Sequence, residues 1–202
     1  RPAHHLGVAA ITEQLLADDT FDVDDVIVTA GGSSYFDRVV AGLAGIEASG
    51  RSAHLVIRSG CYISHDGGKY EKLSPLAGRA PEGEELHLVN ALTAWGSVLS
   101  RPEPELVIIG IGKRDVAFDL VNPMPRTLYR QGDGTTEDLS GLQIARLMDQ
   151  HAFMVVPPDL VIAAGDVVAM DMSHPCTAFD KARVIPLIDD ANVVVDAVMT
   201  FF

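Results

Sequence analysis

The sequence is poor in cysteine and in basic residues, and both shortages restrict what the protein can be. Two cysteines, Cys61 and Cys176, cannot cross-link a secreted mini-domain of 202 residues, so the sequence predicts a reducing, cytoplasmic compartment, with one disulfide still open. Only 15 lysines and arginines accompany 28 aspartates and glutamates, which gives a formal net charge of −13. Such an acidic surface repels phosphate backbones and anionic lipids, so we expect no nucleic-acid and no membrane partner.

Long apolar runs are missing as well. No apolar run approaches the roughly 20 residues that a membrane span requires. The chain also opens without the basic-then-apolar pattern of a signal sequence. The 48% apolar content, with 18 glycines and 11 prolines, therefore predicts a soluble protein of one compact domain or two small ones.

The first 50 residues have the pattern of an α/β protein. A loosely helical stretch at 6–16 is followed by a β-branched run at 26–30, a glycine-rich turn at 31–34 and an amphipathic stretch at 36–46. One such βα unit cannot cover both faces of a parallel strand. We therefore expect the terminal part of a larger α/β domain, with a boundary at Ser49–Gly50 and the other repeats lying outside this sequence.

From residue 51 onward, short apolar runs alternate with turn signals such as Gly67–Gly68 and Asp133–Gly134. This spacing predicts an antiparallel β-barrel or sandwich over 51–202, with one helix at Leu139–Met148. The fold class is therefore α+β or mainly β. The expected strands are 53–58, 85–90, 92–99, 106–111, 128–130, 153–156, 167–172, 183–188 and 192–200.

A glycine-rich turn between a strand and a helix is a candidate phosphate site. Gly31 and Gly32 let the backbone approach an anion, and Ser33 adds a hydroxyl donor beside the N–H groups at the helix start. The alternative is an ordinary tight turn in which Ser33 or Ser34 caps the following helix.

His174 and Cys176 are the candidate metal ligands. On an extended segment, side chains two residues apart share one face, so the imidazole and the thiolate would converge on one borderline metal such as zinc. Two protein ligands leave room for water or substrate. The alternative is a half-buried histidine beside an inert buried cysteine.

Two further groups of residues are candidates for a site. If residues 58–65 form a strand, Tyr62 or His65 can point into a cleft, whereas the alternative is that His65 merely starts the Gly67–Gly68 turn. Asp115 and Asp119 belong either to an exposed loop or to the rim of a site, and the sequence does not decide between these.

The stretch Gly165–Arg183, which contains Ser-His-Pro-Cys and Thr-x-Phe-Asp-Lys, resembles the closing signature of the D-threonine aldolase and D-serine dehydratase family. In these fold-type III pyridoxal-phosphate enzymes a (β/α)8 barrel precedes a β-rich domain. Arg58–Tyr62 resembles the first strand after the barrel, and Thr29–Ser34 the late-barrel phosphate turn. The resemblance implies that 1–50 is the last βα unit of the barrel and 51–202 the β-barrel-like C-terminal domain.

The same resemblance implies roles for several residues. His174 and Cys176 match the metal pair, with the cysteine favouring Zn²⁺, or another divalent metal such as Mn²⁺, and the dehydratase side of the family. Gly31, Gly32 and Ser33 match the turn that holds the phosphate of pyridoxal 5′-phosphate, and Tyr62 and His65 are weaker matches to catalytic positions. Ala182 departs from the bulky aromatic that relatives often carry.

A lysine is missing where the family needs one. The cofactor is held as a Schiff base to a lysine near the start of the barrel, whereas the four lysines of this chain all lie in the expected β-domain, at positions 69, 72, 113 and 181. We therefore expect the chain to be inactive without an N-terminal barrel half, present as a second chain or fragment. A homodimer is a further assembly that the resemblance allows.

The expected function is part of a pyridoxal-phosphate- and metal-dependent lyase that acts on a small D-3-hydroxyamino acid. The dehydratase reaction would convert D-serine or D-threonine to a 2-oxo acid and ammonia. One alternative is D-threonine aldolase, which would give glycine and an aldehyde. Another alternative is a non-catalytic β-domain that binds a metal or a partner chain.

Overall fold

The computed structural model describes residues 3–46, 51–76 and 79–201, which form two compact units. The first unit runs to Tyr62 and includes the segment Leu73–His87, and the second comprises Ile63–Lys72 and the chain from Leu88 onward. The boundary expected at Ser49–Gly50 lies outside the described residues. In the described chain the units divide near Tyr62 instead, and the segment 73–87 returns to the first unit.

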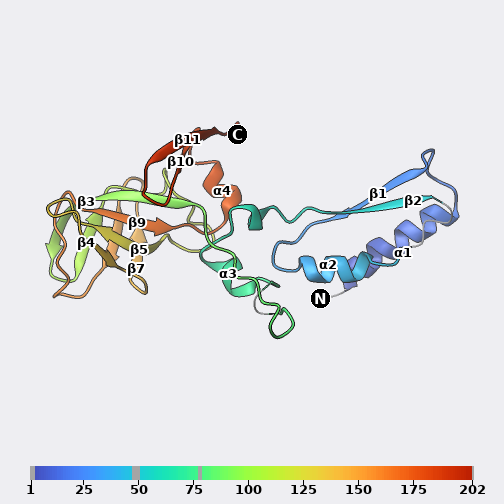
Figure 1. Ribbon diagram of the computed structural model, residues 1–202, viewed down its shortest axis with the longest axis horizontal. Coiled ribbons are helices and arrows are strands. Elements are labelled where there is room, and N and C mark those ends of the chain that lie inside the picture. Colours follow the sequence, from blue (N-terminus) through green and yellow to red (C-terminus); the bar gives the residue numbers. More distant parts are fainter. Residues whose placement is uncertain (1–2, 47–50, 77–78, 202) are drawn as a thin grey trace. The chain divides into compact units, whose positions relative to one another are not determined.

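The first unit is a short parallel sheet with helices on one face (Figure 1). It contains α1 (Ala3–Ala17), β1 (Asp25–Ala30), α2 (Phe36–Leu43) and β2 (Ser52–Ile57). β1 and β2 pair in parallel, and every second residue of β1 is buried against the helices. Ile27 points to the other face and is 67% exposed. The predicted order of helix, strand, turn and helix is present, while its place in a (β/α)8 barrel stays a prediction.

Two predictions between residues 53 and 62 are wrong. The run 53–58 was assigned to the β-rich domain, but β2 pairs with β1. The strand expected at Arg58–Tyr62 is instead an unpaired link into the 3₁₀ turn η1 (Gly60–Ile63). The parallel ladder ends where the N–H of Arg58 donates to the carbonyl of Ala30 at 2.9 Å, because β1 offers no further residues to pair with.

The second unit is built on a curled antiparallel sheet of seven strands (Figure 1). The spatial order is β6-β5-β9-β3-β4-β8-β7. Side chains from six of these strands form one core, in which Ile109, Leu128, Met154 and Val168 are completely buried. The strands are β3 (Thr93–Glu103), β4 (Leu106–Ile109), β5 (Met124–Tyr129), β6 (Thr136–Asp138), β7 (Gln143–Leu147), β8 (Ala152–Val155) and β9 (Val167–Asp171).

The helix predicted at Leu139–Met148 is wrong, because this segment forms a turn and strand β7. Ile144 and Leu147 are buried three residues apart, which imitates the spacing of a helix face. In the structure the register with β8 shifts between Ile144 and Arg146, and this irregularity brings both apolar side chains to the core side. The strand expected at 85–90 is also absent from the described chain, where these residues have no regular structure.

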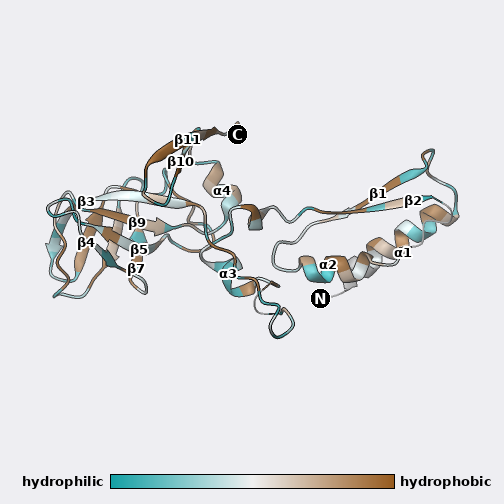
Figure 2. Ribbon diagram, in the orientation of Figure 1, coloured by the Kyte–Doolittle hydropathy of each residue, from teal (hydrophilic) through white to brown (hydrophobic). Residues whose placement is uncertain are grey.

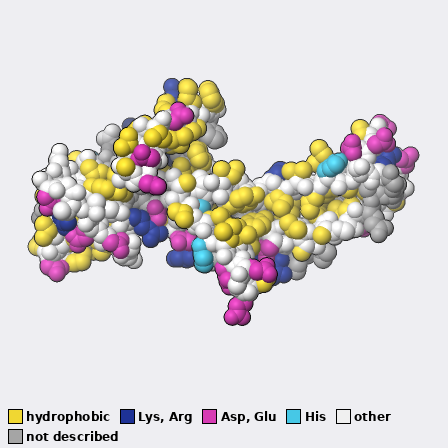
Figure 3. All heavy atoms as spheres, viewed as in Figure 1, with side chains coloured by type: hydrophobic (Ala, Val, Ile, Leu, Met, Phe, Trp, Pro, Cys, Tyr) yellow, Lys and Arg dark blue, Asp and Glu magenta, His cyan; other side chains and the backbone are white. Residues whose placement is uncertain are grey.

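A separate antiparallel hairpin follows the main sheet. It consists of β10 (Val184–Ile188) and β11 (Val194–Met199), which pair only with each other among the described strands. Both strands are apolar in Figure 2, and in Figure 3 hydrophobic side chains gather over them. Seven of their large apolar side chains are exposed, namely Val184, Leu187, Ile188, Val194, Val195, Val198 and Met199. Among the described helices, none is long and apolar enough to cross a membrane.

A buried carboxylate ties two distant segments of the second unit together. Asp66 is completely buried, at 0% exposure, just before α3 (Lys69–Leu73). Its Oδ1 accepts a hydrogen bond from the N–H of Gly68 at 2.7 Å, and its Oδ2 accepts one from the Ser173 hydroxyl at 2.9 Å. Oδ2 also accepts the His174 N–H at 2.6 Å. These donors compensate the cost of removing the carboxylate from water.

We predict that Asp66→Ala lowers the free energy of unfolding by about 3 kcal/mol or more, because it leaves several buried donors without their charged acceptor. Urea unfolding measures this. The control is Asp159→Ala, an exposed aspartate, which should change stability by no more than about 0.5 kcal/mol. Equal unfolding midpoints for the two variants would contradict the role given to Asp66.

We also predict that Gly112→Ala destabilises the second unit by about 1–3 kcal/mol. A Cβ atom at Gly112 would lie 2.5 Å from backbone atoms of Asp149 and Gln150, which cannot swing away as a side chain can. Gly132→Ala is the matched control, because a Cβ atom there meets nothing within 4 Å. Its effect should stay below about 1 kcal/mol in the same thermal unfolding measurement. If Gly112→Ala unfolds at the same temperature as wild type, the close backbone contact at Gly112 does not restrict the size of the side chain there.

Candidate functional site

His174 lies in the turn between β9 and the short helix α4 (Pro175–Phe179). Its backbone is left-handed, with φ 57° and ψ 75°, a conformation that costs energy for a residue other than glycine. The hydrogen bond from its N–H to Asp66 holds it there, and Pro175 begins the helix at the position where proline is favoured. The buried carboxylate thus stabilises a strained backbone at the candidate metal ligand.

The imidazole of His174 is held by a second carboxylate, which comes from the loop between β4 and β5. Nδ1 of His174 is paired with Oδ2 of Asp119. The Thr177 hydroxyl donates to Oδ1 of the same carboxylate at 2.8 Å. Partial desolvation raises the pKa of Asp119, but the hydrogen bonds from His174 and Thr177 outweigh it and leave the pKa below its ordinary value. Both carboxylate oxygens of Asp119 are therefore placed to accept hydrogen bonds from the turn that carries His174.

The premise that His174 and Cys176 share one extended segment is wrong. β9 ends at Asp171, His174 is in the left-handed conformation, and Cys176 lies in the first turn of α4. The cause is Pro175, whose fixed φ suits the start of a helix. Convergence of the two side chains on one metal therefore cannot rest on strand geometry.

The donor types of this pair nevertheless fit zinc. An imidazole nitrogen and a thiolate sulfur are ligands that zinc prefers, and the thiol of Cys176 is exposed. Because Asp119 is bonded to Nδ1, Nε2 is the ring nitrogen left to bind a metal. Within the described ranges, no group of three or more His, Cys, Asp or Glu side chains is placed to hold a metal ion. The residues fit a two-ligand site open to water or substrate, and the metal pair stays a prediction.

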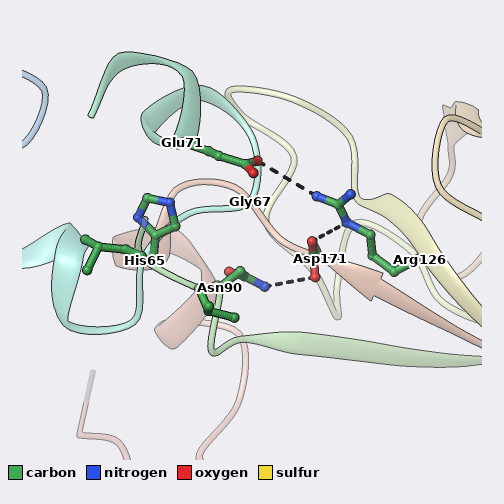
Figure 4. A pocket seen from close by; sticks show the side chains of 8 residues that line it. His65, Gly67, Glu71, Asn90, Arg126 and Asp171 are labelled. Atoms are coloured by element: carbon green, nitrogen blue, oxygen red, sulfur yellow. Dashed lines mark hydrogen bonds and ion pairs between the residues drawn. The ribbon is translucent and has the colours of Figure 1, made fainter. Parts of the chain in front are cut away.

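A polar cavity of about 230 Å³ is lined by His65 and Gly67, the two chain neighbours of Asp66 (Figure 4). Arg126 lines it, with its Nε donating to Asp171 and a terminal nitrogen 3.8 Å from Glu71. Asn90 donates to the other oxygen of Asp171 at 3.1 Å. One guanidinium therefore pairs with two carboxylates, and Asp171 is held from two sides.

His65 lines this cavity and is itself well buried, at 5% exposure. Like His174, it has a left-handed backbone, with φ 55°. Its neighbour Asp66 fixes the chain on one side, and on the other the carbonyl of Ser64 accepts the N–H of Ala91 at 2.8 Å. Fixed in a polar cavity, an imidazole can take up or release a proton. The catalytic role of His65 stays a prediction.

The candidate phosphate turn in the first unit keeps its donors free. In the described part of the chain, no group accepts the backbone N–H of Gly32, Ser33 or Ser34. Gly32 has φ 135°, which L side chains rarely adopt, and α2 begins directly after this turn at Phe36. The alternative reading with Ser33 or Ser34 as helix cap is wrong, because the cap position is Tyr35 and no side chain caps there. Successive free N–H groups fit a phosphate.

The position of Tyr62 gives little evidence for or against a catalytic role. Its side chain is 43% exposed and its ring packs near Phe36, with 5.5 Å between ring centroids. Tyr62 and the turn Gly31–Ser33 belong to the first unit, whereas His65, His174 and Cys176 belong to the second. Their proposed roles stay predictions.

The structure connects His65 and His174 through Asp66, which sequence reasoning passed over as part of a turn. It also separates the two aspartates that the sequence left undecided. Asp115 accepts the N–H of Gly112 at 2.8 Å and so belongs to a local turn, whereas Asp119 contacts the candidate metal ligand. The only signal for this difference is the Thr-x-Phe-Asp-Lys run, whose threonine also bonds to Asp119.

Comparison with known proteins supplies independent evidence. Residues 91–188 match a family model described as "Putative serine dehydratase domain". The matched stretch contains the seven-stranded sheet, Asp119, His174 and Cys176. No curated protein sequence matches the chain.

Several solved structures have the same fold. D-threonine aldolase from Filomicrobium marinum is similar with a TM-score of 0.65 and 20% identity, over 94% of this chain and 44% of that one. An alanine racemase-like protein from Idiomarina loihiensis has a TM-score of 0.54 and 13% identity, over 91% of this chain and 46% of that one. D-threo-3-hydroxyaspartate dehydratase from Delftia sp. HT23 has a TM-score of 0.52 and 10% identity, over 96% of this chain and 50% of that one. The chain thus spans half the length of these proteins or less, and at these identities the likeness shows the fold.

Two variants of that dehydratase are also similar, with TM-scores of 0.54 and 0.53. In one a histidine is replaced by alanine, and in the other a cysteine is replaced and the protein is in a metal-free form. The fold and the family match agree with the resemblance carried by Gly165–Arg183. Residues 91–188 of this chain are therefore similar to the serine dehydratase domain, and the chain has the fold seen in D-threonine aldolase and D-threo-3-hydroxyaspartate dehydratase.

Proposed function

We propose that this chain is the C-terminal part of a pyridoxal-phosphate- and metal-dependent lyase that acts on D-3-hydroxyamino acids by dehydration. The observation that carries the proposal is the His174 site, where two carboxylates fix the backbone and the ring of a histidine two residues before an exposed cysteine. The family match over 91–188 includes this site and supports the same conclusion. The chain has no counterpart of the Schiff-base lysine, so activity requires the barrel half.

Dehydration is favoured over aldol cleavage by the cysteine. A thiolate and an imidazole form a borderline-soft donor pair that suits zinc. D-threo-3-hydroxyaspartate dehydratase is known as a histidine and a cysteine variant whose positions are two apart, as His174 and Cys176 are here, and the cysteine variant is in a metal-free form. The same spacing of His174 and Cys176 supports our proposal that both bind the metal.

The bound groups would supply the bond-breaking chemistry: pyridoxal phosphate acts as the electron sink at Cα, and zinc weakens the bond to the β-hydroxyl. The chain itself supplies position. Gly32 and Ser33 offer N–H donors to the cofactor phosphate, and His174 and Cys176 offer donors to the metal. His65 is the candidate group for proton transfer, because its imidazole lines the polar cavity.

We predict that the assembled enzyme, with this chain and the polypeptide that carries the Schiff-base lysine, releases ammonia and pyruvate from D-serine and no glycine from D-threonine. Product analysis by coupled ammonia and pyruvate assays and by amino-acid chromatography measures this. His174→Ala should lower the turnover at least about 100-fold, because a metal worth several kcal/mol in the transition state loses a ligand.

His87→Ala, in which an exposed histidine outside the site is replaced, is the matched control and should leave turnover unchanged. If the products are glycine and an aldehyde, the enzyme is an aldolase and the proposed dehydration is wrong. Full turnover in His174→Ala, or in wild type after treatment with a chelator, would contradict the proposed role of the metal.

We also predict that Gly32→Ala weakens binding of pyridoxal phosphate to the assembled enzyme about tenfold or more, because alanine is strained at φ 135° and the turn must rearrange. A titration followed by the visible absorbance of the cofactor measures the affinity. Gly7→Ala, in α1 with nothing within 4 Å of the new Cβ atom, is the control. Equal affinity for both variants would exclude this turn as the phosphate site.

A further inference from the structure

Asp119 is the side chain that distinguishes the His174 site from an exposed histidine on a turn. It is 41% exposed and contributes no buried packing, yet both of its carboxylate oxygens are engaged, Oδ2 by the His174 ring and Oδ1 by the Thr177 hydroxyl. Two donors that lie three residues apart on the same turn therefore meet one acceptor from a loop more than 50 residues away in sequence.

The loop that carries Asp119 is firmly placed. Val116 and Ala117 are almost completely buried, and Ala117 packs in one apolar cluster with Ala178 of α4 and Leu92. This cluster fixes the distance between the loop and α4, so the carboxylate is presented to the ring by packing that does not involve the ring itself. The arrangement is the support that a ligand histidine needs, with its other nitrogen bonded to a carboxylate.

The hydrogen-bonding chemistry decides which nitrogen is free. A carboxylate can only accept, so Nδ1 of His174 is the protonated nitrogen that donates to Asp119. In the neutral ring, which is the form that binds a metal, Nε2 then has the lone pair. In the absence of Asp119, the neutral ring can carry its proton on either nitrogen and can rotate, so part of the population would not present Nε2 as a ligand.

We propose that Asp119 is the positioning residue of the metal site, which fixes the tautomer and the orientation of His174 without binding the metal. The inference rests on the proposed metal role of His174 and Cys176 and goes beyond it, because it gives a task to a residue that binds neither the metal nor the substrate. Thr177 supports the role by holding the second oxygen of the carboxylate.

The test is the affinity of the full chain for Zn²⁺, measured by competition with a chromophoric chelator, for wild type, His174→Ala and three variants of the loop. Asp119→Ala should bind Zn²⁺ about 10–100-fold more weakly, as is usual when the hydrogen-bond partner of a ligand histidine is removed. Asp119→Asn should also bind Zn²⁺ more weakly than wild type, because its amide NH2 can donate to Nδ1 and so favour the tautomer with the proton on Nε2. Asp115→Asn removes the same charge from the same loop and should bind as wild type does.

A readout without metal accompanies the titration. Nitrogen-15 NMR of the imidazole should report a proton on Nδ1 of His174 in wild type, a mixture of tautomers in Asp119→Ala, and a shift toward the Nε2-protonated tautomer in Asp119→Asn. Wild-type affinity and an unchanged tautomer in Asp119→Ala would overturn the positioning role while leaving the metal pair intact. Weaker Zn²⁺ binding with an unchanged tautomer in Asp119→Ala and Asp119→Asn would make Asp119 a metal ligand, which also overturns it.

Failure of the proposed metal pair has a different signature. If wild type and His174→Ala bind Zn²⁺ equally weakly, the metal role of His174 falls, and the positioning role falls with it. If wild type binds Zn²⁺ and His174→Ala does not, the metal role of His174 is supported. The comparison of the Asp119 variants then tests the positioning role of Asp119 by itself.

Discussion

The carboxylate of Asp66 cannot reach water, so the protein has to surround it with donors, and the geometry of the candidate site follows from how it does so. The donors come from the turn before α3 and from the end of β9, segments that are 107 residues apart. Joining them fixes the backbone of His174 in a left-handed conformation and places His65 at the edge of the polar cavity. Substitutions that perturb Asp66 therefore reach both histidines at once.

Two carboxylates divide the task of holding one histidine. Asp66 acts on the backbone from inside the protein, whereas Asp119 acts on the ring from a half-exposed loop. The first contact belongs to folding, because its loss exposes buried donors. The second serves the proposed metal site, because it fixes the orientation of the ring. The backbone and the ring of one histidine are thus held by separate contacts.

The sequence predicted most strands of the second unit because short apolar runs, such as those of β4 and β9, are separated by turn signals. It failed at β7, where a register irregularity turns the strand pattern into a helical one, and at β2, whose apolar run does not reveal its partner. His174 and Cys176 were recognisable as a local motif. Asp66 and Asp119 were not, since their meaning lies in contacts 108 and 55 residues away.

The position of β9 in the seven-stranded sheet determines the order in which the second unit can fold. β9 is the last of the seven strands in the sequence, yet it lies between β5 and β3 in the sheet. Without β9, the pair β5–β6 and the four strands β3, β4, β8 and β7 share no hydrogen-bonded ladder. Until residue 171 has been synthesised, these two groups lack the strand that joins their ladders, and β5 and β3 each have an open edge. The site around His174, three residues later, therefore cannot form before the sheet can be completed.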